Sequence, residues 1–317
     1  MEPLRYQGEA RGALARLGDV AWLECATQAE FMEILARDWD VLVTRLGLAV
    51  DAAALAAAPS LRVVATPTTG VDHIDTAALV GRGARLVSLR GETEFLESIR
   101  ATAEHTWALL LALCRRLAAA SHDVTRGRWR REPYLGSELH DKSLGIIGCG
   151  RLGRMVAGYG LAFGMRVLAH DIVPDAWARA PGGTQPASAE QALGTDVVSL
   201  HLPLDASTRG WLTAARLRAM HPGALLVNTA RGELIDEAAL LAALHGGRLA
   251  GAALDVLAGD GSWDGAVPGG AEHPLVAYAA QHDSLIITPH IGGYGRESIA
   301  RTRHFLVDRL RAALEGQ

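Results

Sequence analysis

Two side chains in the second half of the chain have the chemistry that a small organic acid requires. Arg231 follows an apolar run at 225–228, and His290 follows another at 285–288. An arginine binds both oxygens of a carboxylate through its planar guanidinium, and a histidine gives or takes a proton near neutral pH. Hydride transfer from a hydroxy acid needs an anchor for the acid and a base for the hydroxyl proton. These two residues are therefore candidate catalytic groups.

A glycine-rich turn in the middle of the chain predicts a dinucleotide site. The segment GCGRLG at 148–153 follows an apolar run at 143–147 that predicts a strand, and the residues after it predict a helix. In that context Gly148 permits the tight turn, Gly150 lets the backbone approach a pyrophosphate, and Gly153 lets the helix pack on the strand. The pyrophosphate would meet the free N–H groups and the positive dipole end of the helix.

The acid that follows this turn predicts which dinucleotide binds. Asp171 ends the next apolar run, close to the roughly 20-residue offset expected of a ribose-binding acid. Its carboxylate would accept hydrogen bonds from the ribose hydroxyls and repel a 2′-phosphate. The neighbours His170, Ile172 and Val173 include no Arg or Lys to accommodate that phosphate. The sequence therefore predicts NAD(H) in preference to NADP(H).

Apolar runs that predict strands alternate with helical segments along the whole chain. The runs lie at 20–23, 41–44, 62–66 and 85–89 ahead of the glycine turn, and at 166–170, 197–201, 225–228, 252–255 and 285–288 after it. Continuous apolar strands that alternate with helices indicate parallel sheets covered on both faces. We predict an α/β chain of two doubly wound, Rossmann-like domains with a cleft between them.

The domain boundaries follow from the position of the turn and of two long helices. We predict a substrate-binding domain at 1–106, completed by 288–317, and an NAD-binding domain at 107–287. A helix from about 100 to 120 is expected to bridge the halves, and a helix from about 297 to 315 to return to the first domain. The glycine-rich stretch at 259–270 predicts an exposed loop.

Composition excludes several classes of function. The 317 residues are 49% hydrophobic and 21% charged, which is ordinary for a globular protein of about two domains. A net charge of −4 argues against a nucleic-acid partner or an anionic membrane surface. The apolar stretch at 107–114 is too short to span a membrane, the N-terminus has no signal-peptide core, and the three cysteines are scattered. We expect a cytoplasmic protein without a metal site.

Seven short motifs occur in order along nearly the whole chain. They are TGVDHID at 69–75, AEHT at 103–106, LGIIGCGRLG at 144–153, LHLPL at 200–204, VNTARG at 227–232, ALDV at 253–256 and TPHIGG at 288–293. Their sequences and order resemble the D-isomer-specific 2-hydroxyacid dehydrogenases, in particular the phosphoglycerate dehydrogenase-like branch without its regulatory C-terminal domain.

The resemblance implies roles for individual residues. Arg231 would anchor the substrate carboxylate, His290 would be the acid/base, and Asp255 would grip the nicotinamide carboxamide together with the backbone near Ala230. The implied cofactor-binding set is Gly148, Gly150, Arg151, Leu152, Gly153, Asp171, His201, Pro203, Thr208, Thr229, Ala230, Arg231, Asp255, His290 and Gly292. The implied substrate-binding set is Arg45, Thr68, Thr69, Gly70, Arg231 and His290.

The third member of the family's catalytic set is altered in this chain. The family places a Glu followed by Pro shortly after the Leu-Asp-Val strand, to orient the catalytic His; here Asp260 stands in that position and no Pro follows. Asp is one methylene shorter, and a positioning error near 1 Å costs on the order of a hundredfold in rate. Asp260 is the preferred partner of His290, Glu272 is the alternative, and a His290 without a carboxylate partner is the third reading. Tyr294, where the family usually has Ala, would narrow the pocket.

Two functions from different classes fit these residues. The first is an NAD-dependent oxidoreductase that transfers a hydride between nicotinamide and C2 of a small 2-hydroxy or 2-oxo acid; no residue determines which acid. The alternative is a non-catalytic NAD-binding regulator, as in the corepressor branch of the family. The resemblance also implies a homodimer through the cofactor domain, with Trp129, Pro133, Tyr134 and Leu135 as candidate contacts.

Overall fold

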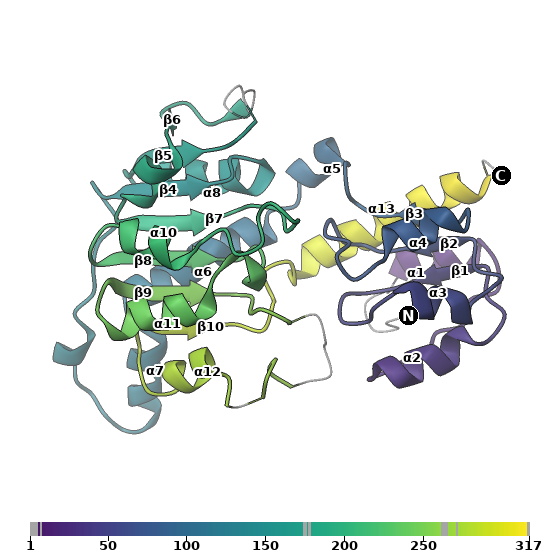
Figure 1. Ribbon diagram of the computed structural model, residues 1–317, viewed down its shortest axis with the longest axis horizontal. Coiled ribbons are helices and arrows are strands. Elements are labelled where there is room, and N and C mark those ends of the chain that lie inside the picture. The colour runs from purple at the N-terminus through teal and green to yellow at the C-terminus, as the bar shows by residue number, and fades with distance from the viewer. Residues whose placement is uncertain are drawn as a thin grey trace. The chain divides into compact units, whose positions relative to one another are not determined.

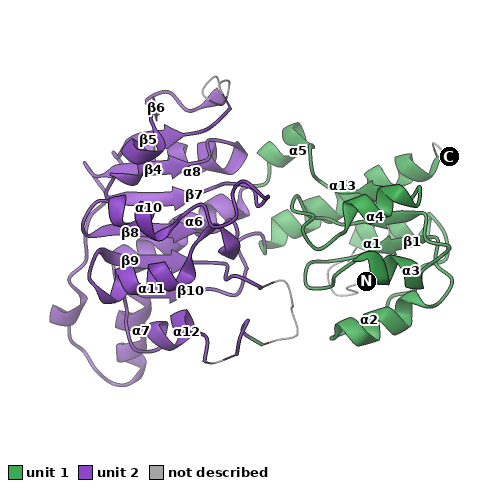
Figure 2. Ribbon diagram, in the orientation of Figure 1, with its two compact units in different colours: residues 1–99, 260–266, 294–317 green, residues 100–259, 267–293 purple. Residues whose placement is uncertain are grey.

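The computed structural model describes residues 6, 8–173, 176, 179–260, 266–270 and 272–315. Within it the chain forms two units (Figure 2): unit 1 comprises residues 1–99, 260–266 and 294–317, and unit 2 comprises residues 100–259 and 267–293. Each unit is built on its own parallel sheet. The expected α/β class, with two parallel sheets, is confirmed.

Unit 2 contains a sheet of seven described strands in the order β10-β9-β8-β7-β4-β5-β6 (Figure 1). Every neighbouring pair is parallel. The strands are β4 (Ser143–Ile147), β5 (Arg166–His170), β6 (Gln185–Pro186), β7 (Val197–Leu200), β8 (Ala224–Asn228), β9 (Leu249–Leu254) and β10 (Leu285–Ile287). The chain order reverses at β4, where β5 lies on one side and β7 on the other, so the carboxyl end of β4 is where ligands bind in open sheets.

Helices cover both faces of this sheet. The helices of unit 2 are α6 (Ala101–Cys114), α7 (Leu117–Thr125), α8 (Arg151–Ala162), α9 (Ala189–Leu193), α10 (Ala214–Ala219), α11 (Glu237–His245) and α12 (Pro274–Ala279), with 3₁₀ turns η2 (Glu132–Tyr134) and η4 (Gly232–Leu234). Leu144 and Ile146 of β4 pack in a core cluster with α6 and α8, whereas Ile147 packs in the cluster with α10, α11 and α12. Burial on both faces explains why β4 reads as a continuous apolar run.

Unit 1 has a three-stranded parallel sheet in the order β1-β2-β3. Its strands are β1 (Val41–Val43), β2 (Val63–Ala65) and β3 (Arg85–Val87), and its helices are α1 (Gly8–Ala15), α2 (Gln28–Leu35), α3 (Ala52–Ala57), α4 (Thr76–Gly81), α5 (Thr93–Glu97) and α13 (Arg296–Glu315). Val64 packs on the cluster formed with α3 and α4, whereas Val63 and Ala65 pack on α1 and α13. The C-terminal helix α13 therefore packs in unit 1.

Two expectations about the elements are wrong. Residues 20–23 form no strand; Val20 and Trp22 instead pack against the cluster of α1 and α13. The long helix expected from about 100 to 120 is two helices, because Arg116 adopts a left-handed conformation with φ +50° between α6 and α7. The stretch 259–270 lies partly outside the described residues.

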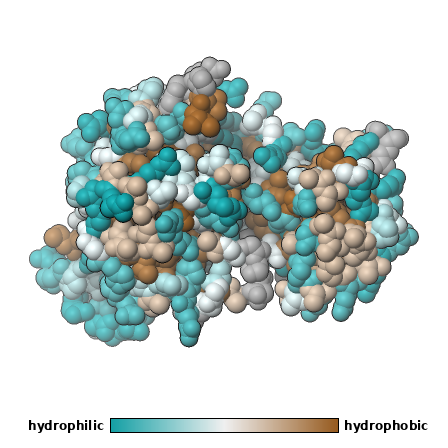
Figure 3. Space-filling model, in the orientation of Figure 1, coloured by the Kyte–Doolittle hydropathy of each residue, from teal (hydrophilic) through white to brown (hydrophobic). Residues whose placement is uncertain are grey.

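Hydrophilic and hydrophobic side chains are interspersed on the face of each unit that Figure 3 shows. Exposed large apolar side chains include Ile172 and Trp129, which are 86% and 90% exposed. Among the described residues, no helix has both the length and the apolar character needed to cross a membrane.

Candidate active site

The turn between β4 and α8 needs glycine at two of its three fingerprint positions. Gly148 has φ +94°, and a Cβ there would lie 2.7 Å from the carbonyl oxygen of His201. A Cβ on Gly153 would lie 2.0 Å from the carbonyl oxygen of Gly148. Helix α8 therefore packs this closely against the end of β4 only because residue 153 has no Cβ. Gly150 caps α8, and a Cβ there would meet nothing within 4 Å. The backbone at the helix N-terminus is therefore open to a ligand on that side, which suits a pyrophosphate.

Asp171 lies beside this turn, directly after β5. Its Oδ2 accepts a 2.7 Å hydrogen bond from the amide of Cys149, and its Oδ1 accepts one of 2.8 Å from the amide of Val173. A carboxylate offers about four acceptor positions, so both oxygens keep capacity for ribose hydroxyls. The carboxylate and the open end of α8 together fit the adenosine side of a dinucleotide. Arg151 and Leu152, in the first turn of α8, are half-buried.

The loop after β7 holds the next three predicted cofactor residues. His201 Nε2 lies 2.8 Å from Ser199 Oγ, and desolvation lowers the pKa of His201 to about 4, so the ring is neutral near pH 7. Its Nδ1 is buried without a hydrogen-bond partner in the described part of the chain. The hydroxyl of Thr208 donates to the carbonyl oxygen of Pro203 over 2.7 Å, so this side chain shapes the loop itself.

Asn228 fixes the turn that carries Arg231. Its fully buried side chain accepts a 3.0 Å hydrogen bond from the amide of Ala230 and donates a 2.8 Å hydrogen bond to the carbonyl of Arg231. The Nη1 of Arg231 donates to the carbonyl of Ala230 over 2.7 Å. The next residue, Gly232, lies against the backbone of Leu257, since a Cβ there would be 2.0 Å from that carbonyl carbon. The guanidinium is thus attached to a rigid turn at the carboxyl end of β8.

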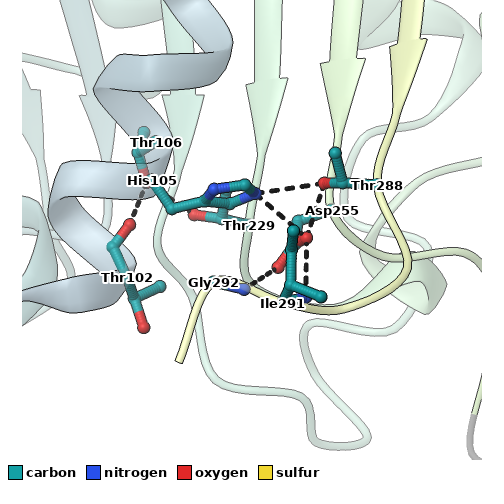
Figure 4. A network of polar contacts seen from close by, with 8 residues as sticks. All are labelled: Thr102, His105, Thr106, Thr229, Asp255, Thr288, Ile291 and Gly292. Carbon is teal, nitrogen blue, oxygen red and sulfur yellow. Dashed lines mark hydrogen bonds and ion pairs between the residues drawn. The ribbon is translucent and has the colours of Figure 1, made fainter. Parts of the chain in front are cut away.

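Asp255, at the carboxyl end of β9, organises the loop that carries His290 (Figure 4). The side chain is 1% exposed. Its Oδ1 accepts from the hydroxyl of Thr288 at 2.6 Å and the amide of Ile291 at 2.9 Å, and its Oδ2 accepts from the amide of Gly292 at 2.6 Å. Its backbone carbonyl accepts a 2.8 Å hydrogen bond from the amide of His290. The sequence predicted a cofactor-binding role for Asp255 and did not predict that its side chain holds the loop of His290.

The predicted acid/base residue has an uncommon backbone. His290 is half-buried with φ +53°, in the left-handed region that non-glycine residues seldom adopt. Such conformations persist where the surroundings hold them, and they concentrate at functional sites. The hydrogen bonds from 290–292 to Asp255 supply that hold.

His105 on α6 completes this network and was missed as a site residue. Its Nε2 lies 3.2 Å from Asp255 Oδ1 and 3.1 Å from Thr288 Oγ1. The signal in the sequence for a role of His105 was its place in the AEHT segment. Its partners Asp255 and Thr288 lie 150 and 183 residues away, so no local pattern could link them to it.

The remaining predicted residues belong to unit 1. The guanidinium of Arg45 donates to the carbonyls of Leu46 and Cys25 at 3.2 and 3.3 Å. The hydroxyl of Thr68 donates to the carbonyl of Gly70 over 2.7 Å and so shapes the 68–70 loop. Asp260 also groups with unit 1, and its pairing with His290 stays a prediction.

Two acidic side chains of unit 2 that the sequence did not single out hold the turn before Asp260. Glu237 Oε1 accepts a 2.8 Å hydrogen bond from the amide of Ala258, and Glu233 Oε1 accepts one of 3.2 Å from the amide of Gly259. Glu272, the alternative partner of His290, is exposed. Within the described residues, no cluster of His, Cys, Asp and Glu side chains is arranged to hold a metal ion.

Comparison with known proteins agrees with this geometry. Residues 107–292, more than half of the chain, match the family model described as the NAD-binding domain of D-isomer specific 2-hydroxyacid dehydrogenases. The chain belongs to this family. The match confirms the predicted family and NAD as the cofactor of its domain at 107–292.

Named relatives of the family resemble the chain along most of its length. D-3-phosphoglycerate dehydrogenase of Mycobacterium tuberculosis is 34% identical over 312 residues, which are 97% of this chain and 56% of that protein. The chain thus spans little more than half of the length of that relative. Glyoxylate reductase of Aeropyrum pernix is 37% identical over 89% of this chain and 82% of its own. A D-lactate dehydrogenase from Aquifex aeolicus, solved with NAD and lactic acid, has a TM-score of 0.79 at 29% identity, covering 96% of this chain and 91% of its own.

Proposed function

We propose that the chain is an NAD-dependent D-2-hydroxyacid dehydrogenase, or 2-oxoacid reductase, acting on a small acid. The observation that carries the proposal lies within unit 2. Arg231 follows β8 and His290 follows β10, the two strands on either side of β9, and Asp255 after β9 holds the His290 loop. An anion-binding group and a proton-transfer group thus follow the carboxyl ends of two strands that flank β9, at the edge of the sheet where α/β enzymes bind their ligands.

Each residue then has a definite task. When bound, the nicotinamide supplies or accepts the hydride at C2 of the acid. Arg231 holds the carboxylate by its two-pronged guanidinium and polarises the neighbouring carbonyl. His290, protonated, donates a proton to the carbonyl oxygen in reduction and takes it back in oxidation. The amides of Thr68, Thr69 and Gly70 are proposed to contribute to the carboxylate site.

A panel of 2-oxo acids tests the proposal. We expect the purified chain to oxidise NADH with at least one member of a panel containing glyoxylate, hydroxypyruvate, pyruvate and longer or phosphorylated 2-oxo acids. The names of the relatives favour glyoxylate and 3-phosphohydroxypyruvate as first candidates. Turnover of one acid, lost in His290→Asn, supports an enzyme. NADH binding without turnover of any acid supports the alternative, a regulator of the same fold.

The arm between α7 and β4 supports a proposed homodimer. Asp123 of α7 accepts hydrogen bonds from Arg128 at 2.9 Å and Arg130 at 2.6 Å, and these arginines hold the pKa of Asp123 well below its usual range. The arm so fixed presents Trp129 and Leu135, which are 90% and 87% exposed. Large apolar side chains on a fixed segment suit burial against a second copy. Light scattering of the chain and of a Trp129→Ser, Leu135→Ser variant tests whether this arm forms the dimer interface. A cytoplasmic location is a separate part of the proposal.

A further inference from the structure

The neighbours of His105 determine that its Nε2 atom carries a hydrogen. The side chain is 18% exposed, and its Nε2 lies 3.2 Å from Asp255 Oδ1 and 3.1 Å from Thr288 Oγ1 (Figure 4). The hydroxyl of Thr288 donates its one hydrogen to Asp255 Oδ1. A carboxylate only accepts, so both neighbours of Nε2 present acceptors to it. Nε2 therefore carries a hydrogen and donates it into this pair.

The contacts continue from Asp255 to the acid/base residue. A carboxylate that is 1% exposed needs donors around it, and His105 supplies one from outside the β10 loop. The same carboxylate accepts the amides of Ile291 and Gly292, while the Asp255 carbonyl accepts the amide of His290. His105 thus stands at the start of a chain of hydrogen bonds that ends at the left-handed backbone of His290.

The neighbouring residue on α6 makes the corresponding contact to the other loop. Thr106 donates its hydroxyl hydrogen to the carbonyl of Thr102 at 2.8 Å, so Thr229 is the donor in the 2.8 Å contact between the two hydroxyls of Thr106 and Thr229. Thr229 lies two residues before Arg231. One turn of α6 therefore contacts both loops that carry the candidate catalytic side chains.

We propose that His105 is a positioning residue: its Nε2–H fixes the Asp255 carboxylate, and through it the backbone of 290–292, so that the imidazole of His290 is aimed for proton transfer. The proposal rests on the proposed function for the role of His290. It does not require His105 to touch the substrate or the cofactor. The donor at Nε2, rather than the bulk of the ring, is the property that matters.

Two amide substitutions separate the donor from the rest of the ring. The amide nitrogen of His105→Gln reaches about as far as Nε2, whereas that of His105→Asn is one methylene shorter. We expect His105→Asn to lower kcat roughly 10- to 100-fold, as for a reacting group displaced by about 1 Å. The dissociation constant of NADH should change by a smaller factor than kcat, because the glycine turn and Asp171, which are proposed to hold the adenosine side, are untouched. His105→Gln should recover most of kcat.

Hydrogen–deuterium exchange reads the loop without relying on turnover. The amides of Ile291 and Gly292 donate to Asp255, so they should exchange at least about tenfold faster in His105→Asn and near the native rate in His105→Gln. The control is His304→Asn, the same change at a half-exposed position of α13. It should leave kcat and both exchange rates unchanged.

The outcomes separate this proposal from the proposed function. Native kcat and exchange in His105→Asn, or a Gln variant as impaired as the Asn variant, would overturn the positioning role. Loss of kcat with native exchange at 291–292 would also overturn it, because the loop would then not be the intermediary. A wild-type chain inactive on every acid of the panel would overturn the proposed function, while the exchange comparison would still decide whether His105 holds the loop.

Discussion

The amide of Gly292 donates a 2.6 Å hydrogen bond to Oδ2 of Asp255, and a Cβ on Gly292 would lie 2.8 Å from that same oxygen. The close approach of the β10 loop to the buried carboxylate therefore requires glycine at this position. The same Cβ would also lie 3.3 Å from Cγ2 of Thr102 on α6. The His290 loop is thus enclosed by a strand end on one side and a helix on the other.

Gly292→Ala should destabilise unit 2 and impair turnover. Asp255 cannot move away without losing its other donors, and disturbing a buried charged hydrogen bond costs about 1–3 kcal/mol. The matched control is Gly293→Ala, where a Cβ would meet only Thr102 Oγ1 at 3.9 Å. Thermal unfolding should show a clear drop in Tm for Gly292→Ala and little for Gly293→Ala. Equal melting temperatures for the two variants would contradict the geometry.

Asp171 should make the chain prefer NADH to NADPH. Its carboxylate lies beside the turn at β4 and would repel a 2′-phosphate. Fluorescence titration should give NADH a dissociation constant roughly tenfold or more below that of NADPH, a difference of about 1.4 kcal/mol. Asp171→Asn should narrow that ratio. Asp283→Asn, which makes the same charge change at the amino end of β10, should not. Equal affinities in the wild type would remove Asp171 from the selection of cofactor.

Arg231 should be needed for its shape as well as its charge. Arg231→Lys keeps the charge and loses the guanidinium that binds two oxygens, so we expect kcat/KM for the active 2-oxo acid to fall by roughly a hundredfold or more. Arg218→Lys, on an exposed position of α10, provides the control for the change itself. Steady-state kinetics decides the matter, and wild-type kcat/KM in Arg231→Lys would exclude bidentate binding.

The strands of this fold were predictable because burial on both faces leaves a continuous apolar run. Four of the five residues of β4, for example, are apolar or glycine. The short edge strand β6, Gln185–Pro186, is exposed and carries no apolar pattern, so no periodicity could indicate it. Residues 20–23 show the opposite error, because a strand was predicted there and none forms. An apolar run indicates burial, and burial alone does not indicate strand geometry.

The catalytic candidates and the residues that support them differ in how far the sequence reveals them. Arg231 and His290 follow strands directly, so the pattern of strands and helices is enough to place them. The link between His105 and Asp255 joins two elements 150 residues apart, and only the packing of α6 on β9 brings them together. Local propensity holds no information on such a contact. The left-handed backbone of His290 is likewise a consequence of hydrogen bonds that form only in the folded unit.

Asp260 should matter more than Glu272 for turnover. A carboxylate that accepts a hydrogen bond from the imidazole of His290 would orient the ring for proton transfer. Asp260→Asn should therefore lower kcat for 2-oxo acid reduction roughly 10- to 100-fold, whereas Glu272→Gln should leave kcat in place. Asp260→Glu should keep activity if the turn held by Glu233 and Glu237 adjusts. An unchanged kcat in Asp260→Asn, with a loss in Glu272→Gln, would assign the role to Glu272.

His201 should make the folded chain less stable as the pH falls below neutrality. Desolvation lowers the pKa of this ring from 6.5 to about 4 in the folded state, while the unfolded chain keeps the ordinary value. Between those two values the unfolded state binds the proton and the folded state does not, so the free energy of unfolding decreases as the pH is lowered. The contribution is fully present above about pH 6.5 and is lost progressively toward pH 4.

His201→Gln, which has a side-chain amide to replace the contact with Ser199, removes this titration. Denaturant unfolding at pH 7.5 and pH 5 should thus show a smaller loss of stability for the variant than for the wild type. Equal losses would show that the ring of His201 already accepts a proton in the folded chain at pH 5.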